Sequence, residues 1–592
     1  MTALQYPESK LIDTQWNAFS RVDIVDSPAV RFAPGLSLNY LRSLPPQIGI
    51  SVDGDSLNAI TKYDWEKGDA EFTSSLPSVA AFSMGKIRDV LILEPLGGLD
   101  VLAALYHGAT AIEGIERNPL IARIVKERYG EFAGNIYGNE KVTIRIDDGR
   151  AYLRSSVKKF DLIQIPISNT LGASSTGIYG LSEDYVFTEE AFLDYYRHLN
   201  ENGFLSITQY LLPPPRTELR IISLVISSLE KIGIRNPEDH VAVMRSWGTI
   251  TFLLKSNEIT DKEILNLKEF CRKRRFDLVY YSGIQKEEVN IFNRFKEPLY
   301  YQLISRMMNR EQREELYNQY LFNIRSVTDD KPFFYHFLRW NRLKELYRSI
   351  GEKWQPFIEG AYLIPVVFIQ ALILSIILIM LPLFLKKKEK QRTNLHGKRF
   401  FLPYFFFIGV GFMFIEIPVI QKFILFLGQP AYAVSTVLFA ILVSAGIGSY
   451  LSERLFHSED SHFSWMILIL VGMIILYIFT LPSLFHFGLG KSLIFKHVFS
   501  ILLLTPLGIL MGMPFPLGIG VLRRYSGDII PWAWCVNGCS SVLSAILAVM
   551  VAISLGYSGV LLCSAGAYLM SLTSMRWGIR QVRKQCSGLE QT

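Results

Sequence analysis

The feature that most constrains this chain is a run of 25 residues without a charged side chain, AYLIPVVFIQALILSIILIMLPLFL, at positions 361–385. A helix of roughly 20 apolar residues is long enough to cross a bilayer. Six further apolar segments follow, at about 400–420, 431–451, 463–485, 498–522, 531–555 and 558–574. Residues 361–575 are therefore predicted to form an all-α transmembrane bundle of about seven helices, with a basic tail at 576–592.

Two polar residues inside these apolar segments are functional candidates. A carboxylate within a membrane is costly and marks a functional site by default, which makes Glu416 in GFMFIEIPVIQK a candidate. Pairing near an interface, with Gln421 or Lys422 close by, is the alternative. Asn537 in PWAWCVNGCSS is the second candidate, although an interhelical hydrogen bond is the favoured interpretation there.

The net charge of +7 gathers beside the apolar segments, in KKKEKQR at 386–392, at Arg523 and Arg524, and in RWGIRQVRK at 576–584. Such clusters set membrane topology and contact lipid headgroups. The first half has no basic stripe interleaved with aromatic residues, so no nucleic-acid partner is expected. The five cysteines form no disulfide framework and the histidines lack metal-ligand spacing, so no metal is expected either.

The predicted secondary structure of the first half changes near residue 86. Residues 1–85 contain short strand-like runs punctuated by Pro, Gly and Asp, and predict a β-rich N-terminal piece. Residues 86–258 alternate compact apolar strands with helices, from DVLILEP to the hairpin HVAVMRSWGTITFLLK, which indicates an α/β doubly wound, Rossmann-like sheet. Residues 259–355 are an accessory or linker region whose role the sequence does not specify.

Acidic residues and glycines recur where the predicted parallel strands end. Ligands of such sheets bind beyond the carboxyl ends of the strands, so these residues are the candidate binding set: Glu94, Gly97, Gly98 and Asp100 after the first strand, Glu116 after the second, and Asp147, Asp148 and Gly149 after the third. Glu116 follows Glu94 by 22 residues, the spacing at which an acid reaches ribose hydroxyls.

The first turn, LILEPLGGLD at 91–100, is a poor phosphate cradle. It lacks the GxGxxG fingerprint and carries a carboxylate, Glu94, inside the loop. That charge repels a pyrophosphate and attracts a cationic sulfonium with an amino-acid tail. The turn therefore favours a nucleoside that bears positive charge.

The block DVLILEPLGGLDVL…AIEGIERNP…IRIDDGRAYL…KKFDLIQIPI…FTEEAFLDYYRHLNENGFLSI resembles the spermidine synthase branch of the S-adenosylmethionine-dependent methyltransferase superfamily. TDDKPFFYHF at 328–337 and the apolar half resemble bacterial membrane proteins that carry a spermidine-synthase-like module. The resemblance implies that Glu116 holds the ribose hydroxyls, that Asp148 and Gly149 approach the adenine amino group, and that the stretch from Glu94 to Asp100 wraps the methionine-derived tail. The implied cofactor is S-adenosylmethionine or its decarboxylated form, without a metal.

The chain departs from that family where an acid-base group is expected. Pro166 stands where aminopropyltransferases carry the first Asp of DSSDP, and Asn169 replaces the second. Neither can act as a general base, which favours methyl transfer over aminopropyl transfer. The segment SEDYVFTEE after the fourth strand supplies the catalytic candidates Tyr185 and Asp184, although helix capping also accounts for such a sequence.

The sequence thus predicts a membrane-anchored spermidine-synthase-like transferase. The alternative is a catalytically inactive nucleoside-binding domain that regulates a membrane transporter or sensor. The expected partners are the lipid bilayer and a small-molecule or lipid acceptor, with homo-oligomer formation left open. The expected location is a bacterial inner membrane with the soluble part in the cytoplasm, where adenosylmethionine is found, although seven spans and the basic loops place that part outside by the positive-inside rule.

Overall fold

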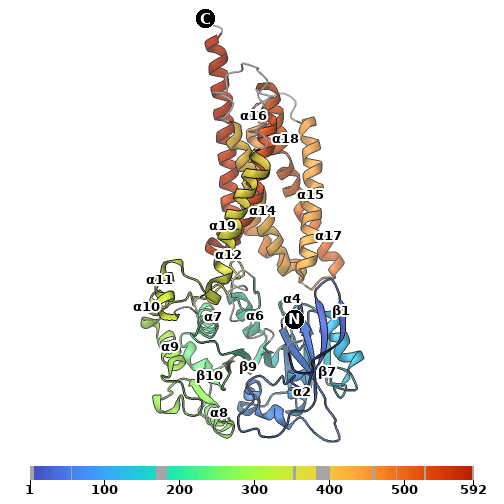
Figure 1. The fold of residues 1–592 in the computed structure, drawn as a ribbon, viewed down its shortest axis with the longest axis vertical. Helices are drawn as coiled ribbons and strands as arrows, with labels where there is room; N and C mark the ends of the chain where they lie inside the picture. Colours follow the sequence, from blue (N-terminus) through green and yellow to red (C-terminus); the bar gives the residue numbers. More distant parts are fainter. Residues whose placement is uncertain are drawn as a thin grey trace. The chain divides into compact units, whose positions relative to one another are not determined.

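The computed structural model describes residues 6–54, 56–167, 183–350, 355–381, 401–455, 460–488, 490–525 and 529–589. The chain divides into two compact units, Met1–Ala361 and Tyr362–Thr592. Each unit has its own core of buried apolar side chains. The boundary coincides with the predicted start of the apolar half (Figure 1).

The N-terminal piece is a four-stranded antiparallel meander. Its strands are β1 (Lys10–Trp16), β2 (Arg21–Asp26), β3 (Gln47–Val52) and β4 (Ser56–Thr61), paired in chain order. The β-rich character predicted for 1–85 ends at Thr61, because short helices follow: η2 (Glu71–Ser75), η3 (Pro77–Val79) and α1 (Ala80–Met84). Four of the six residues of β3 are buried and the other two, Ile48 and Val52, are partly exposed, so this strand packs closely on its neighbours.

A second, eight-stranded sheet forms the centre of the first unit, in the order β12-β10-β11-β9-β8-β5-β6-β7. The five strands β5 (Asp89–Leu93), β6 (Ala111–Glu116), β7 (Val142–Ile146), β8 (Phe160–Ile165) and β9 (Leu199–Tyr210) are parallel. The antiparallel strands β10 (Val241–Arg245), β11 (Thr249–Lys255) and β12 (Asp277–Tyr280) complete it. The predicted closing hairpin is therefore confirmed as β10–β11.

The strand order reverses at β5, since β6 and β7 lie on one side of it and β8 and β9 on the other. The helices that follow these strands are α2 (Leu99–Tyr106), α3 (Pro119–Arg123), α4 (Gly149–Ser155), α6 (Glu189–Arg197) and α7 (Thr217–Lys231). Right-handed crossovers running in opposite directions place helices on opposite faces, which is the doubly wound fold. The switch point between β5 and β8 is the place where such sheets bind ligands.

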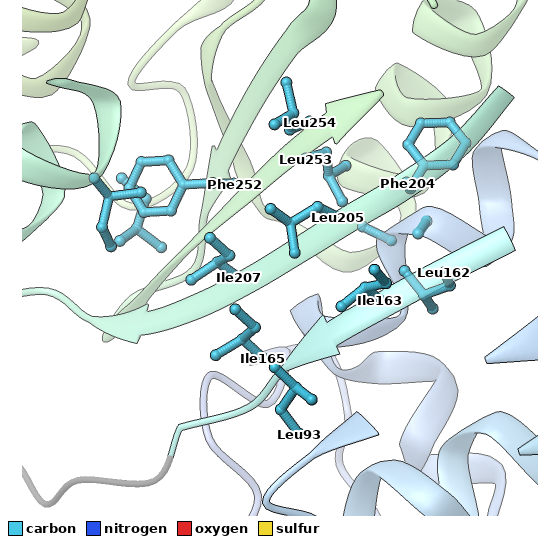
Figure 2. Packing of buried hydrophobic residues seen from close by; sticks show 14 of the residues in the cluster. Leu93, Leu162, Ile163, Ile165, Phe204, Leu205, Ile207, Phe252, Leu253 and Leu254 are labelled. Atoms are coloured by element: carbon cyan, nitrogen blue, oxygen red, sulfur yellow. The ribbon is translucent and has the colours of Figure 1, made fainter. Parts of the chain in front are cut away.

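The central parallel strands β5, β6 and β8 are buried on both faces, whereas the edge strand β7 is largely exposed. In Figure 2 the side chains of Ile163, Ile165 and Ile207 lie beside one another across β8 and β9, with Leu93 of β5 next to Ile165. All four are almost fully buried. This packing fixes the carboxyl ends of β5, β8 and β9, from which the candidate site is built.

The accessory region belongs to the same compact unit. It contains α8 (Asp261–Arg274), strand β12, α9 (Leu299–Met308), α10 (Arg310–Gln319) and α11 (Leu343–Ile350). Strand β12 extends the large sheet by pairing with β10, and Met307 and Ile304 join the common core. Between α10 and α11, residues 323–337 cross the domain without regular structure. We call this segment the strap.

Within its described residues, the second unit contains five helices long and apolar enough to cross a membrane. They comprise α14 (Leu402–Leu427), α15 (Pro430–Leu455), α16 (Asp460–Gly488), α17 (Leu493–Gly512) with α18 (Pro514–Tyr525), and α19 (Ile530–Leu589). Gly556 has non-helical φ/ψ and divides α19 into two halves at a predicted boundary between spans. A shorter apolar stretch, Leu363–Ile379, belongs to α12 (Gln355–Ser375) and the π-helical turn after it.

Helix α14 packs against both halves of α19 through glycines. An added Cβ at Gly409 would lie 2.1 Å from Oγ of Ser540 in the first half. One at Gly411 would lie 2.7 Å from the ring of Tyr568 in the second half. Small residues allow this close approach of membrane helices.

Candidate functional site

The turn after β5 is fastened entirely from within the protein. The amide of Glu94 donates to the carbonyl of Ile115 (2.8 Å), and the amide of Gly98 donates to Pro95 (2.8 Å). The amides of Leu96 and Gly97 donate to the side chains of Glu116 (3.2 Å) and Asn58 (3.1 Å). Pro95 has no N–H. A phosphate cradle needs backbone amides that face the ligand, and every amide from Glu94 to Gly98 already has an acceptor within the protein.

The two glycines of the turn have structural reasons to be glycine. At Gly97 an added Cβ would lie 2.1 Å from the carbonyl oxygen of Ala59 in β4. Gly98 has φ +88° and would bring a Cβ within 2.6 Å of Ile136. The glycine pair therefore lets the N-terminal sheet and the core approach the turn closely. Direct contact of Gly97 and Gly98 with a ligand stays a prediction.

Glu116 lies at the end of β6 and is only 2% exposed. Its Oε1 accepts the amide of Asn118 (2.9 Å) and its Oε2 accepts the amide of Leu96. Burial, followed by the negative charge of Glu94, raises the pKa of Glu116 to about 7. The carboxylate thus joins the turns after β5 and β6, while a second lone pair on each oxygen remains for a ribose hydroxyl.

One guanidinium lies between the acids at the strand ends. Arg117 is hydrogen bonded to the Glu94 carboxylate, and its Nε is 3.9 Å from Oδ2 of Asp148. The charges of Glu94, Asp148 and Asp184 together raise the pKa of Arg117 further above its ordinary value. With Glu116 beside them, four carboxyl groups thus surround a single cation.

The turn after β7 is shaped by helix capping. Oδ1 of Asp148 accepts the amides of Arg150 and Ala151, both at 3.0 Å, as the N-cap of α4. Its Oδ2 is the atom that faces Arg117. Asp147 is exposed, and its Oδ1 accepts the amide of Asp148 (2.8 Å). Gly149 packs close to Leu93, where a Cβ would lie 3.1 Å from a methyl group.

A pocket opens at the switch point of the sheet, with about 420 Å³ of space that includes its mouth. Most of its lining is apolar, and its charged members are Glu94 and Asp100. Burial raises the pKa of Asp100 to about 6, although Gln164 donates to its Oδ1 at 2.6 Å. The other lining residues are Phe32, Pro34, Asn58, Leu76, Ser78, Pro95, Leu96, Leu99, Pro166, Ile167 and Thr208.

The segment 184–188, which precedes α6, brings the catalytic candidates to this site. Oδ1 of Asp184 accepts the amide of Val186 (2.9 Å), and burial raises the pKa of Asp184 to about 6 while Arg117 opposes the shift. The pKa of Tyr185 is raised well above its usual value, first by burial and then by the charge of Glu183. Tyr185 is therefore a protonated phenol at neutral pH. Asn169, the other residue weighed for acid-base work, lies outside the described residues.

Several residues of the site escaped sequence reasoning. Arg117 directly follows the predicted binding residue Glu116, and a basic side chain at that position could have identified it as part of the site. Asn58 and Gln164 lie in segments for which the sequence predicts strands but no binding role. Tyr137, whose hydroxyl donates to the carbonyl of Leu96 (2.7 Å), follows a left-handed Asn135 that no pattern predicted.

The membrane candidates differ in their surroundings. Asn537 donates from Nδ2 to the carbonyl of Phe405 (3.0 Å), which is the interhelical hydrogen bond favoured for it. Glu416 is half-buried on α14 and has no hydrogen-bond or ion-pair partner within the described part of the chain. Lys422, one of the neighbours considered for it, instead lies 3.3 Å from Oγ of Ser558. Across the described ranges, no group of three or more His, Cys, Asp or Glu side chains could hold a metal ion.

Solved structures similar to the chain include three spermidine synthases. The enzyme from Thermotoga maritima has 18% identity and a TM-score of 0.33 over 50% of this chain and 88% of its own. A spermidine synthase with the transition-state analogue AdoDATO has 18% identity and a TM-score of 0.32 over 50% and 87%. A probable spermidine synthase from Corynebacterium glutamicum has 15% identity and a TM-score of 0.29 over 44% and 87%.

No protein-family model and no curated protein matches the chain. The structural similarities are too low to carry a conclusion about activity. The fold class rests on the strand order and the reversal at β5 described above.

Proposed function

We propose that the first unit is a transferase whose donor is a sulfonium-bearing nucleoside of the S-adenosylmethionine type. The observation that carries this proposal is the convergence of Glu94, Glu116, Asp148 and Asp184 around Arg117 at the ends of the parallel strands. An excess of carboxylates attracts a cation. The amides from Glu94 to Gly98 are bonded internally, which argues against a phosphate-bearing ligand in this part of the turn.

Arg117 supports S-adenosylmethionine over its decarboxylated form. The carboxylate of the full donor needs N–H groups or a cation, and the amides from Glu94 to Gly98 already have acceptors. Arg117 comes from the neighbouring strand end and is 39% exposed at its side chain, so it can exchange Glu94 for the donor carboxylate. Glu94 and Asp100 then suit the donor ammonium. This arrangement favours methyl transfer.

Asp184 is the group best suited to accept the proton that methyl transfer releases. In the reaction an acceptor O–H or N–H attacks the methyl carbon, the carbon–sulfur bond breaks to leave a neutral thioether, and the acceptor proton passes to the Asp184 carboxylate. A base with a pKa near 6 is ionised at neutral pH and still basic enough to take a proton. Tyr185 retains its proton and suits hydrogen-bond donation to the acceptor.

The pocket beside the donor site supports an apolar acceptor. Phe32, Leu76, Leu99 and Ile167 supply its walls. A lipid-soluble acceptor also agrees with a chain in which five helices can cross a membrane. We therefore place the protein in a cell membrane, with the soluble unit in the cytoplasm where the donor is made.

Donor binding and turnover test this proposal. The full chain in lipid nanodiscs is titrated with S-adenosylmethionine and with its decarboxylated form in a calorimeter. It is then incubated with methyl-labelled donor and total membrane lipid. Heat of binding with label in the lipid fraction supports methyl transfer, whereas a polyamine product from the decarboxylated donor alone overturns it. Absence of binding by both donors overturns the transferase.

The carboxylate of Glu416, which has no partner among the residues that the structure describes, favours a second candidate, a transporter or sensor regulated by the nucleoside-binding unit. An intramembrane acid without a protein partner is a natural site for a transported proton or cation. Under this alternative Glu416→Gln abolishes transport by the bundle in proteoliposomes. Under the transferase proposal the same variant leaves methyl transfer at the wild-type rate.

A further inference from the structure

The strap, residues 323–337, lies against the segment that carries Asp184. Backbone hydrogen bonds join the two at both ends, from Asp184 N–H to the carbonyl of Pro332 (2.8 Å) and from Glu189 N–H to the carbonyl of Val327 (2.9 Å). The rings of Phe187 and Phe334 stack with centroids 4.7 Å apart. The segment before α6 is therefore held by residues about 140 positions away in the chain.

Asp329 is the centre of this contact. Its carboxylate receives both terminal nitrogens of Arg150, at 2.5 and 3.1 Å, and the hydroxyl of Thr188 at 2.6 Å. Arg154 adds a third arginine nitrogen at 3.0 Å. Such a bidentate, charge-assisted arrangement fixes geometry strongly.

Arg150 carries the constraint to the site. It is buried and follows the N-cap residue Asp148 by two positions on α4, and its Nη1 also donates to the carbonyl of Tyr185 (3.2 Å). Asp194 of α6 forms ion pairs with both Arg150 and Arg154, so two carboxylates, Asp194 and Asp329, balance the charges of the two arginines. The network thus connects the turn after β7, the segment 184–188 and the strap.

Arg220 of α7 anchors the strap itself. This fully buried arginine donates to the carbonyls of Phe333, Phe334, Asn323 and His336, and its guanidinium lies 4.4 Å from the ring centre of Phe337. A buried charge requires such saturation by acceptors. Arg220 consequently fixes the strap to α7 through residues on both sides of Asp329 in the sequence.

We propose that Asp329 is a positioning residue for the transfer reaction, which holds Asp184 toward the Glu94–Arg117 pair through Arg150 and Thr188. This inference rests on the proposed function. Asp329 does not touch the pocket, whose lining includes no strap residue. It acts on the reaction only through the placement of the segment 184–188.

The test compares Asp329→Asn with Glu314→Gln in the full chain in nanodiscs. Both variants remove one carboxylate from an arginine pair, and Glu314 pairs with Arg325 at the exposed surface. Hydrogen exchange followed by mass spectrometry reports on the peptide 184–190. We expect exchange there to rise about tenfold or more in Asp329→Asn, with β5 and β6 peptides unchanged, and to stay at the wild-type rate in Glu314→Gln.

Kinetics separate positioning from a general loss of structure. A misplacement of about 1 Å can lower a rate about 100-fold without loss of binding. We therefore expect kcat of Asp329→Asn to fall about 10–100-fold with donor Kd within about twofold of wild type, and Asp329→Glu to restore part of kcat. Equal loss of donor binding, or unchanged kcat, overturns the positioning role. If the wild-type chain turns over no donor, the proposed function fails, and the positioning role in that reaction fails with it. The hydrogen-exchange measurement still decides, independently of turnover, whether Asp329 fixes the segment 184–188.

Discussion

The guanidinium of Arg117 is hydrogen bonded to the carboxylate of Glu94, and this pair joins the end of β6 to the end of β5. Glu94 itself has φ +57°, an uncommon conformation for a residue with a side chain, which turns the chain sharply after the strand. The pair lies beside Asp148 and Asp184. It therefore supplies both signs of charge that an amino-acid tail requires.

Arg117→Met tests whether this cation receives a donor carboxylate. A charge-assisted hydrogen bond contributes about 1.5–3 kcal/mol, so we expect the affinity for S-adenosylmethionine to fall about 10-fold to 100-fold. The decarboxylated donor should bind as well as before or more tightly, because one positive charge is gone. Calorimetry with both donors measures the ratio. Arg123→Met, an exposed arginine on α3, is the control, and an equal loss for both donors would contradict the assignment.

Glu116→Gln tests the buried carboxyl group that joins the two turns. The pKa of Glu116 is raised from 4.5 to about 7, so the stability it contributes is fully present below about pH 4.5 and is lost as pH rises through about 7. The variant has no such titration. We expect the melting temperature of the variant relative to wild type to rise by about 5 °C between pH 5 and pH 8.

Differential scanning fluorimetry of the full chain across this pH range measures the effect. The comparison with wild type at each pH cancels the other titrating groups, among them Asp100 and Asp184. Glu116→Ala serves as the second variant, because it leaves the amides of Leu96 and Asn118 without their acceptor and should be less stable than Glu116→Gln by about 2–4 kcal/mol at any pH. A pH-independent gap for Glu116→Gln would show that Glu116 titrates normally.

Asp184→Asn tests the proposed base. The asparagine oxygen can still accept the amide of Val186, so the local turn is preserved. We expect donor Kd to stay within about twofold and kcat to fall about 10²–10⁴-fold. In the wild type, kcat should rise with pH through about 6, because Asp184 must be ionised to accept a proton. Glu183→Gln is the control, and retention of the pH 6 transition in Asp184→Asn would assign it to another group.

The ends of β5, β6 and β7 could be located from the sequence because each of these three strands stops at an acid. The local pattern of FTEEAFLDYYRHLNENG at 187–203 predicts a helix that ends at Gly203, and this prediction is wrong for its last residues. Helix α6 ends at Arg197, and Leu199–Tyr210 is strand β9, since Leu199 pairs with Phe160 across the sheet. Tertiary pairing overrode the local helical pattern there.

The contacts between distant segments could not be predicted from local patterns. TDDKPFFYHF was noticed as a motif, but its Asp329 meets Thr188 across 141 residues, and periodicity carries no information at that range. The role of Gly97 likewise depends on β4, which reaches the turn only in the folded chain. The sequence therefore identifies candidate binding residues more readily than the distant residues that position them.

The helices of the second unit alternate in direction. Ser558 and Tyr568 of the second half of α19 lie opposite Lys422 and Gly411 of α14, so these two segments are antiparallel. Nε of Arg576, near the end of α19, donates a hydrogen bond to Oγ of Ser464, near the start of α16. The thiol of Cys535 near the start of α19 lies 3.5 Å from the carbonyl of Ile379, which places the end of the first apolar helix at that same end of the bundle.

This alternation leads to a prediction about sidedness. Arg454, Arg523, Arg524 and Arg576 lie at the end of the bundle where the first apolar helix finishes, and the basic segment 386–392 follows that helix in the sequence. The first unit precedes the start of that helix. With the soluble unit in the cytoplasm, Lys388→Cys should react with a membrane-impermeant maleimide in intact cells. Glu314→Cys, exposed on the soluble unit, should react only after the membrane is opened. The native cysteines are replaced by serine in both. The reverse labelling pattern would place the soluble unit outside, as the positive-inside rule requires, and would remove the cytoplasmic methyl donor from the proposed function.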